Sequence, residues 1–178
     1  MIRFLKSLFK QEDLIIPKTS LEHRLFIEKA MSIIGTSVET FGFVRHDIKI
    51  EEYFSKVTYR KGKLYIQIKG TTYPTDYPYS YNIVLGVGES ENFNEWDWNS
   101  IALWRLINKM ENKNDSKEYD FPFNDKIEIS ILNAKNELLK YADSFMKNDL
   151  KLFNEVLSEQ NITREKYKLN LPDNKLNN

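Results

Sequence analysis

The segment that decides the fold reads YFSKVTYRKGKLYIQIK and covers residues 53–69. On each side of Gly62, apolar side chains recur at every second position, which is the spacing of a strand with one buried face. These side chains are Tyr53, Val57 and Tyr59 before the turn and Leu64, Ile66 and Ile68 after it. Two such runs around a short turn that contains glycine predict an antiparallel β-hairpin.

Two neighbouring segments extend this hairpin into a sheet. Residues 79–87 alternate in the same way, and we predict that they pair antiparallel with the second hairpin strand across the loop 71–78. Their apolar positions are Tyr79, Tyr81, Ile83, Leu85 and Val87. Residues 43–50 precede the hairpin and are predicted as a further strand. The sequence therefore predicts a sheet of three to four strands.

A helix is predicted before the strands. Pro17 and Ser20 form a helix-start signal, and apolar residues then recur at steps of three and four as far as Val38, with Gly42 as the stop. The apolar positions between them are Leu21, Leu25, Ile27, Ala30, Met31 and Ile34. Gly35 lies inside this helix, and it indicates either a close packing contact or an early break.

Helical patterns also follow the strands. We expect helices over residues 98–110 and 124–145 and a shorter one around 150–157. The helix over 124–145 has the most regular apolar face, formed by Ile127, Ile131, Ala134, Leu138, Ala142 and Phe145. Before it, the Phe-Pro-Phe sequence at 121–123 is expected to anchor the chain to the body of the domain.

This order of elements predicts an α+β fold. It has an N-terminal helix, an antiparallel sheet, and two to three C-terminal helices packed on that sheet, because the strands are grouped and do not alternate with helices. The length of 178 residues fits one domain, expected over residues 19–160. Residues 1–18 form an N-terminal segment, and residues 161–178 are expected to be a loosely ordered tail.

Composition excludes several classes of function. The chain has 26 basic and 26 acidic residues, and the resulting net charge of zero argues against an extended nucleic-acid interface. It contains no cysteine, so disulfides, thiolate metal sites and cysteine nucleophiles are impossible. No apolar run approaches the roughly 20 residues of a membrane span. We expect no cofactor and no bound metal, and the oligomeric state is left open.

The first ten residues mix apolar side chains with three cations. Lys6 interrupts any apolar stretch long enough for a secretory signal, so a cytoplasmic location is expected. We favour a short helix that docks its apolar side on the domain. The alternative is a basic amphipathic segment that touches a membrane surface or a partner.

No catalytic motif is recognisable, which favours a non-enzymatic protein. Gly86 and Gly88 lack the third glycine of a dinucleotide-binding loop, and acidic residues follow them. His23 is expected at the surface or its boundary. His46, together with the acidic residues at 47, 51 and 52, is the best local set of metal donors, but a solvated turn is the preferred interpretation.

The segment 89–98, ESENFNEWDW, is the first candidate surface. It carries four carboxylates and three aromatic rings without a cation, a combination that suits a basic protein partner. The predicted contact residues are Glu89, Glu91, Phe93, Glu95, Trp96 and Asp97. The alternative places Trp96 and Trp98 in the core at a helix start, with the acids near the helix N-terminus.

The loop 71–81, TTYPTDYPYSY, is the second candidate surface. It contains four tyrosines and two prolines, and its rings could stack on a sugar or face a protein. The predicted ligand-contacting residues are Tyr73, Asp76, Tyr77 and Tyr79. The alternative is a rigid connection between strands whose rings cap the sheet edge. Because the loop has no basic residue, nucleic acid is the ligand least expected there.

Residues 134–143, AKNELLKYAD, followed by Asn148, Asp149, Leu150 and Phe153, resemble a pattern in a group of small uncharacterised bacterial α+β proteins. That group also has an N-terminal helix ending in Phe-Gly-Phe, as at 41–43 here, an antiparallel sheet and a long C-terminal helix. Some members resemble immunity proteins that neutralise secreted toxins. Asn148 stands where a glycine is common. The resemblance implies a bacterial binding protein and supplies no functional residues.

These observations lead to two hypotheses about function. The first is a non-enzymatic protein-binding domain, of the kind of an immunity protein that neutralises a bacterial toxin. The second is a domain that binds a small molecule or carbohydrate, as an enzyme or otherwise, through the tyrosine-rich loop at 73–81.

Overall fold

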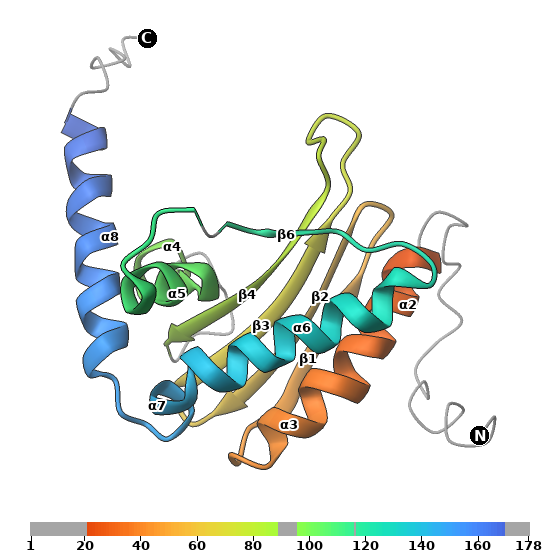
Figure 1. Cartoon of the computed structure of the whole chain (residues 1–178), viewed down its shortest axis with the longest axis horizontal. Coiled ribbons are helices and arrows are strands. Elements are labelled where there is room, and N and C mark those ends of the chain that lie inside the picture. The colour runs from red at the N-terminus through yellow and green to blue at the C-terminus, as the bar shows by residue number, and fades with distance from the viewer. Residues whose placement is uncertain (1–20, 89–95, 116, 170–178) are drawn as a thin grey trace, which may run out of the picture.

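The computed structural model describes residues 21–88, 96–115 and 117–169. Within these ranges the chain forms an α+β fold with an antiparallel sheet, as the sequence predicts (Figure 1). The predicted N-terminal segment 1–18 and most of the predicted acidic surface at 89–98 lie outside the described residues.

The predicted first helix is present as three consecutive helical segments. They are α2 (Leu21–Ala30), the π-helical turn η2 (Met31–Gly35) and α3 (Thr36–Glu39). Gly42 then stops the helix with a φ of 86°, a left-handed conformation that glycine adopts without strain. Of the two interpretations of Gly35, the close contact is confirmed, because a Cβ atom there would overlap the phenol group of Tyr59.

The side of this helix that faces the core differs from the predicted one. Leu21 and Leu25 are exposed, whereas Phe26 and His23 are buried in their place. The remaining buried positions, Ile27, Ala30, Ile34 and Val38, are those of the predicted apolar face.

The sheet contains the predicted hairpin and both predicted extensions. Its first four strands are β1 (Val44–Ile50), β2 (Phe54–Lys61), β3 (Leu64–Thr71) and β4 (Ser80–Val87). Adjacent strands are antiparallel throughout, and Val57, Ile68 and Ile83 lie side by side on three successive strands. Gly62 occupies the hairpin turn with a φ of 57°.

The sheet is larger than predicted, because two short strands extend it beyond β4. β5 (Ser100–Ala102) pairs with Val84–Gly86, and β6 (Tyr119–Asp120) pairs with Ser80 and Tyr81. The predicted helix over 98–110 is therefore wrong at its start. It is divided into α4 (Trp96–Asn99), β5 and α5 (Leu103–Glu111).

The predicted helix over 124–145 is observed in two parts, α6 (Lys126–Tyr141) and α7 (Asp143–Met146). All six residues of its predicted apolar face are buried. The last helix, α8 (Lys151–Leu169), continues past Asn161, where the apolar pattern fades in the sequence. Nothing in the described part of the chain forms a helix long and apolar enough to cross a membrane.

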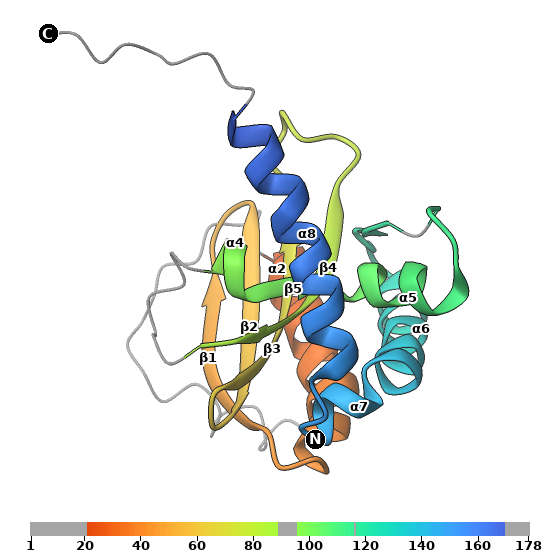
Figure 2. The same ribbon diagram turned by 90° about the vertical axis from the view of Figure 1, so that its left-hand side faces the viewer.

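Two layers enclose the main core. The α2–α3 helix and α6 lie side by side across one face of the sheet (Figure 1). α5 and α8 pack together near β5, and Figure 2 shows α8 running along this side of the molecule. The opposite border of the sheet is β1, whose pairing with β2 is interrupted by a register shift between Arg45 and Asp47.

Candidate functional site

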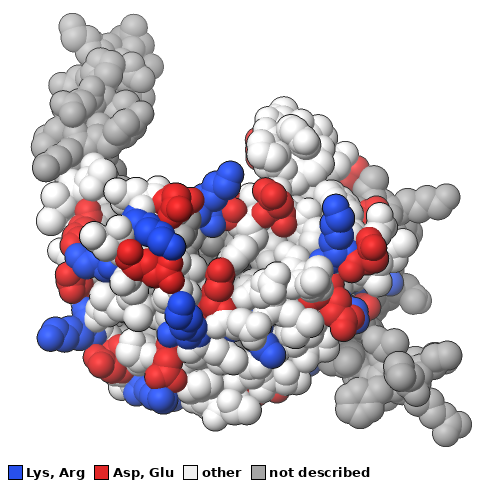
Figure 3. Space-filling model, viewed as in Figure 1, with Lys and Arg blue, Asp and Glu red and all other residues white. Residues whose placement is uncertain are grey.

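The loop between β3 and β4 projects beyond the rest of the sheet (Figure 1). It carries Tyr73, Tyr77 and Tyr79, and at its base it lies beside Tyr53 and Phe123. We call these five aromatic residues the tyrosine surface. Tyr77 is 81% exposed, Tyr73 is 39% exposed and Phe123 is 38% exposed. In Figure 3 the projecting loop is mostly free of charged side chains.

Ring contacts join neighbouring residues of the loop to one another and to two distant segments of the chain. The ring centroids of Tyr53 and Tyr73 lie 5.8 Å apart, and those of Tyr77 and Tyr79 lie 5.6 Å apart in an edge-to-face arrangement. Tyr79 contacts Phe123 at 6.3 Å between centroids. Such pairs stabilise the positions of the rings before any ligand arrives.

Backbone hydrogen bonds fix both ends of the loop. The Thr72 N–H donates to the Tyr53 carbonyl at 2.9 Å, and the Phe121 N–H donates to the Tyr79 carbonyl at 2.9 Å. Within the loop, the Asp76 N–H donates to the Tyr73 carbonyl at 2.8 Å and closes a turn. The loop is therefore anchored to the segment before β2 and to the segment after β6.

The space beneath the loop is filled by side chains. Phe121 packs on Phe26 and on His23, with ring centroids 5.0 and 4.8 Å apart. Tyr81 contacts Phe26 at 5.1 Å and donates its hydroxyl hydrogen to the Ser130 carbonyl at 3.0 Å. All four aromatic groups are buried. Phe123 contacts Phe121 with ring centroids 5.2 Å apart, and Tyr79 packs against the same core, so the base of the tyrosine surface rests on packed side chains.

His23 connects the helical layer to the base of the loop. The prediction that it lies at the surface is wrong, because it is only 1% exposed. Its Nδ1 lies 2.7 Å from Ser55 Oγ, and its Nε2 lies 2.8 Å from Thr72 Oγ1. Desolvation lowers the pKa of His23 to about 4, against an opposing effect of the Glu22 carboxylate. Since Ser55 is fully buried, this hydroxyl–imidazole pair has no access to a substrate in this conformation.

The first candidate surface stays a prediction. Glu89, Glu91, Phe93 and Glu95 lie outside the described residues, as do the side chains of Trp96 and Asp97. Only the backbone of the last two is described, in α4. Trp98 is partly buried, and its carbonyl accepts a hydrogen bond from Asn161 Nδ2 at 3.0 Å.

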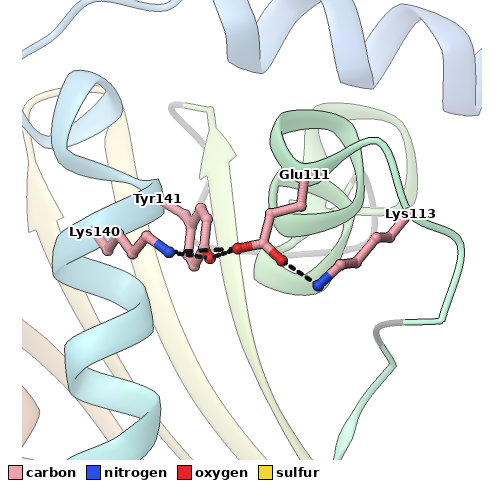
Figure 4. A network of polar contacts seen from close by, with 4 residues as sticks. All are labelled: Glu111, Lys113, Lys140 and Tyr141. Atoms are coloured by element: carbon pink, nitrogen blue, oxygen red, sulfur yellow. Dashed lines mark hydrogen bonds and ion pairs between the residues drawn. The ribbon is translucent and has the colours of Figure 1, made fainter.

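A second polar cluster links α5 to α6 (Figure 4). Glu111 accepts hydrogen bonds from Lys113 Nζ at 2.7 Å, from the Tyr141 hydroxyl, and from Lys140 Nζ at 3.3 Å. These three contacts, with that of Lys113 the largest, lower the pKa of Glu111 to about 2. A carboxylate with so low a pKa is a weak proton acceptor near neutral pH, so the cluster is suited to joining two helices and not to general base catalysis.

Two of the four side chains that formed the best local set of metal donors, Asp47 and Glu51, are engaged in ion pairs. Asp47 Oδ2 lies 2.9 Å from Lys56 Nζ, and Glu51 Oε1 lies 2.7 Å from Lys49 Nζ. Across the described ranges, no group of three or more histidine and carboxylate side chains is arranged to hold a metal ion.

Two hollows open elsewhere on the molecule. A polar cleft of about 290 Å³ lies between α5 and α8, where Lys109 bridges Glu155 at 2.7 Å and Glu159 at 2.6 Å. A more apolar hollow of about 430 Å³ lies beside Gly62 and Leu150, between the β2–β3 turn and the start of α8. Neither includes a residue of the tyrosine surface.

Sequence reasoning identified Tyr73, Asp76, Tyr77 and Tyr79, and the structure places all four on one loop. It did not assign Tyr53 or Phe123 to this site. For Phe123, the Phe-Pro-Phe sequence at 121–123 was the available signal, because two rings around a proline indicate a segment anchored to the domain. The sequence did not show that this segment is anchored beside the loop.

Comparison of the chain with family models, curated proteins and solved structures found no match. Any function proposed for this protein therefore rests on its own residues alone.

Proposed function

We propose that this protein is a non-enzymatic protein-binding domain and that the tyrosine surface is its contact surface. One observation carries the proposal: Tyr77 and Tyr73 remain 81% and 39% exposed on a loop whose two ends are fixed by hydrogen bonds to the domain. Large rings held in this way are typical of the residues that dominate protein interfaces.

Binding through these rings would gain contact area at a small cost in conformational entropy. A tyrosine ring covers about 150–250 Å² of contact area, and it has few rotatable bonds to immobilise. Because Tyr73 and Tyr77 already rest against Tyr53 and Tyr79, little further order is required of them. The packed aromatic core beneath the loop supports contact with a partner's surface over capture of a ligand in a deep cavity.

The particular form of binding that we propose is that of an immunity protein, which neutralises a toxin by covering a part of it. This form is supported by the resemblance of residues 134–153 and 41–43 to small bacterial proteins of that type. The tyrosine surface supplies the interface that such a protein needs.

Carbohydrate binding is the second candidate function. The nearly complete exposure of Tyr77 favours it, because an accessible ring can stack on a sugar. Titration with a set of neutral oligosaccharides, monitored by tyrosine fluorescence, separates the two functions. A saturable response that is lost in Tyr77→Ala would support sugar binding.

The main experiment compares proteins captured by three baits from a bacterial lysate. The baits are the wild-type protein, the double variant Tyr73→Ser/Tyr77→Ser, and the control Met110→Ser, which removes a side chain that is 52% exposed on α5. We expect a protein captured by the wild type and the control but depleted at least about tenfold by the double variant, as for the loss of two interface anchors.

The captured protein is then purified and titrated against each bait by calorimetry. The proposal fails if the double variant retains wild-type affinity for every captured protein. It also fails if the control loses affinity to the same extent, since binding would then depend on general surface hydrophobicity.

A further inference from the structure

Three exposed carboxylates lie within two residues of rings of the tyrosine surface. Glu52 precedes Tyr53 in the sequence, and its carboxylate raises the pKa of the Tyr53 hydroxyl group. Asp76 precedes Tyr77 on the loop and is exposed. Asp125 is exposed two residues after Phe123.

These three side chains take part in no ion pair within the described ranges. Lys49 lies on the same side as Tyr73 but is paired with Glu51 at 2.7 Å. Lys126 follows Asp125 at the start of α6. The border of the tyrosine surface therefore carries a local negative charge, although the net charge of the whole chain is zero.

We propose that the partner presents lysine or arginine side chains to this surface. The inference depends on the proposed function and specifies the chemistry of the partner. A cation is attracted by the face of an aromatic ring and by a neighbouring carboxylate, so each ring–acid neighbour offers two favourable contacts to one basic side chain. The guanidinium group of arginine fits this arrangement best, because it is planar and binds carboxylates with two hydrogen bonds.

The same charges argue against single-stranded nucleic acid, which is the other large class of ligands for exposed aromatic rings. Single-stranded nucleic acid stacks its bases on such rings, but its phosphates require cations along the path of the backbone. The border here provides Glu52, Asp76 and Asp125 instead. A phosphate backbone would be repelled, whereas a basic segment of a protein would be attracted.

The first test is an NMR titration with two blocked peptides, tetra-arginine and tetraglutamate. We expect tetra-arginine to shift the backbone amide signals of residues 52–53, 73–79 and 119–125, and tetraglutamate to leave them in place. The shifts should diminish between 50 and 300 mM NaCl, conditions chosen so that screening becomes strong (a Debye length of roughly 6 Å at the higher salt). Shifts from tetraglutamate of equal size, or tetra-arginine shifts confined to other regions, would overturn the inference.

Two double variants, each of which removes two negative charges, make the test specific. Asp76→Asn/Asp125→Asn removes two charges from the border of the tyrosine surface. Glu39→Gln/Asp149→Asn removes two exposed charges at the end of α3 and before α8, at the opposite end of the domain from the loop (Figure 1). We expect the first pair to weaken tetra-arginine binding by about threefold to tenfold and the second to leave it unchanged. Equal effects of the two pairs would show that only net charge matters.

The same variants separate this inference from the function on which it depends. Suppose that the captured partner loses affinity for Tyr73→Ser/Tyr77→Ser but binds Asp76→Asn/Asp125→Asn as well as it binds the wild type. Protein binding then stands, and the basic partner is refuted. If neither variant affects any captured protein, both proposals fail.

Discussion

His23 Nε2 lies 2.8 Å from Thr72 Oγ1, so a buried side chain of α2 holds the residue from which the loop of the tyrosine surface begins. The other ring nitrogen of His23 lies 2.7 Å from Ser55 Oγ on β2. One imidazole therefore joins the helix, the sheet and the base of the loop, and its protonation state bears on the stability of all three.

We expect the protein to lose stability as the pH falls from about 6.5 to about 4. Desolvation depresses the folded-state pKa of His23 from 6.5 to about 4, so the unfolded chain binds this proton first. The stabilisation is therefore complete above pH 6.5 and is lost as the pH approaches 4, with a magnitude on the order of 3 kcal/mol. Urea unfolding at several pH values measures it. An NMR titration of the His23 ring with a midpoint near 6.5 would contradict this expectation.

Gly35→Ala should destabilise the fold by about 1–3 kcal/mol, the usual cost of adding an atom to a packed site. The added Cβ would overlap the Tyr59 hydroxyl oxygen, which is its nearest neighbour. Tyr59→Phe removes that oxygen, so the double variant should regain part of the loss. Thermal unfolding of the two single variants and the double variant forms the test. Strictly additive effects would show that the two sites are not coupled.

Truncating an exposed ring of the tyrosine surface should change the stability of the fold far less than truncating a buried ring of the core. Tyr77→Ala should leave the melting temperature nearly unchanged, because the side chain is 81% exposed. Phe121→Ala should cost about 3–5 kcal/mol, because the ring is buried against Phe26 and His23. Unfolding curves of both variants test this contrast. A large loss of stability in Tyr77→Ala would mean that the ring belongs to the core.

Glu111→Gln should lower stability slightly at neutral pH, and this difference should vanish in acid. The pKa of Glu111 is depressed to about 2, so its contribution is present above pH 4.5 and is lost as the pH falls through about 2. The effect is small because exposed ion pairs are screened by water and salt. Side-chain carboxyl NMR of the wild type provides the measurement. A Glu111 midpoint near 4.5 would show that the contacts with Lys113, Tyr141 and Lys140 do not form.

The parts of the fold that follow from local patterns were predictable from the sequence. The hairpin at 53–69 and the helix over 126–141 each bury one regular set of apolar side chains. β5 was not predictable, because its three residues gain strand structure only by pairing with β4. The face of α2 was ambiguous, since Leu25 and Phe26 are adjacent and only the packing of Phe26 against Tyr81 and Phe121 decides between them.

The candidate site was predictable only in part, for a similar reason. Tyr73, Tyr77 and Tyr79 were identified because they are concentrated in one short segment. Tyr53 and Phe123 come from distant segments, and their positions depend on the hydrogen bonds that fix the loop at Thr72 and Phe121. The periodic pattern of apolar residues in the sequence carries no signal for contacts between such distant segments.

The register shift between Arg45 and Asp47 also has a consequence for how this domain behaves at high concentration. An outermost strand with evenly spaced backbone groups can template the addition of a second chain, which leads to fibrous aggregates. In β1 the shift disrupts that spacing, and the charged side chains of Arg45 and Lys49 are exposed along the strand. Both features are of the kind that disfavours strand-to-strand addition at the open border of a sheet, so we expect this domain to stay free of fibrous aggregates at high concentration.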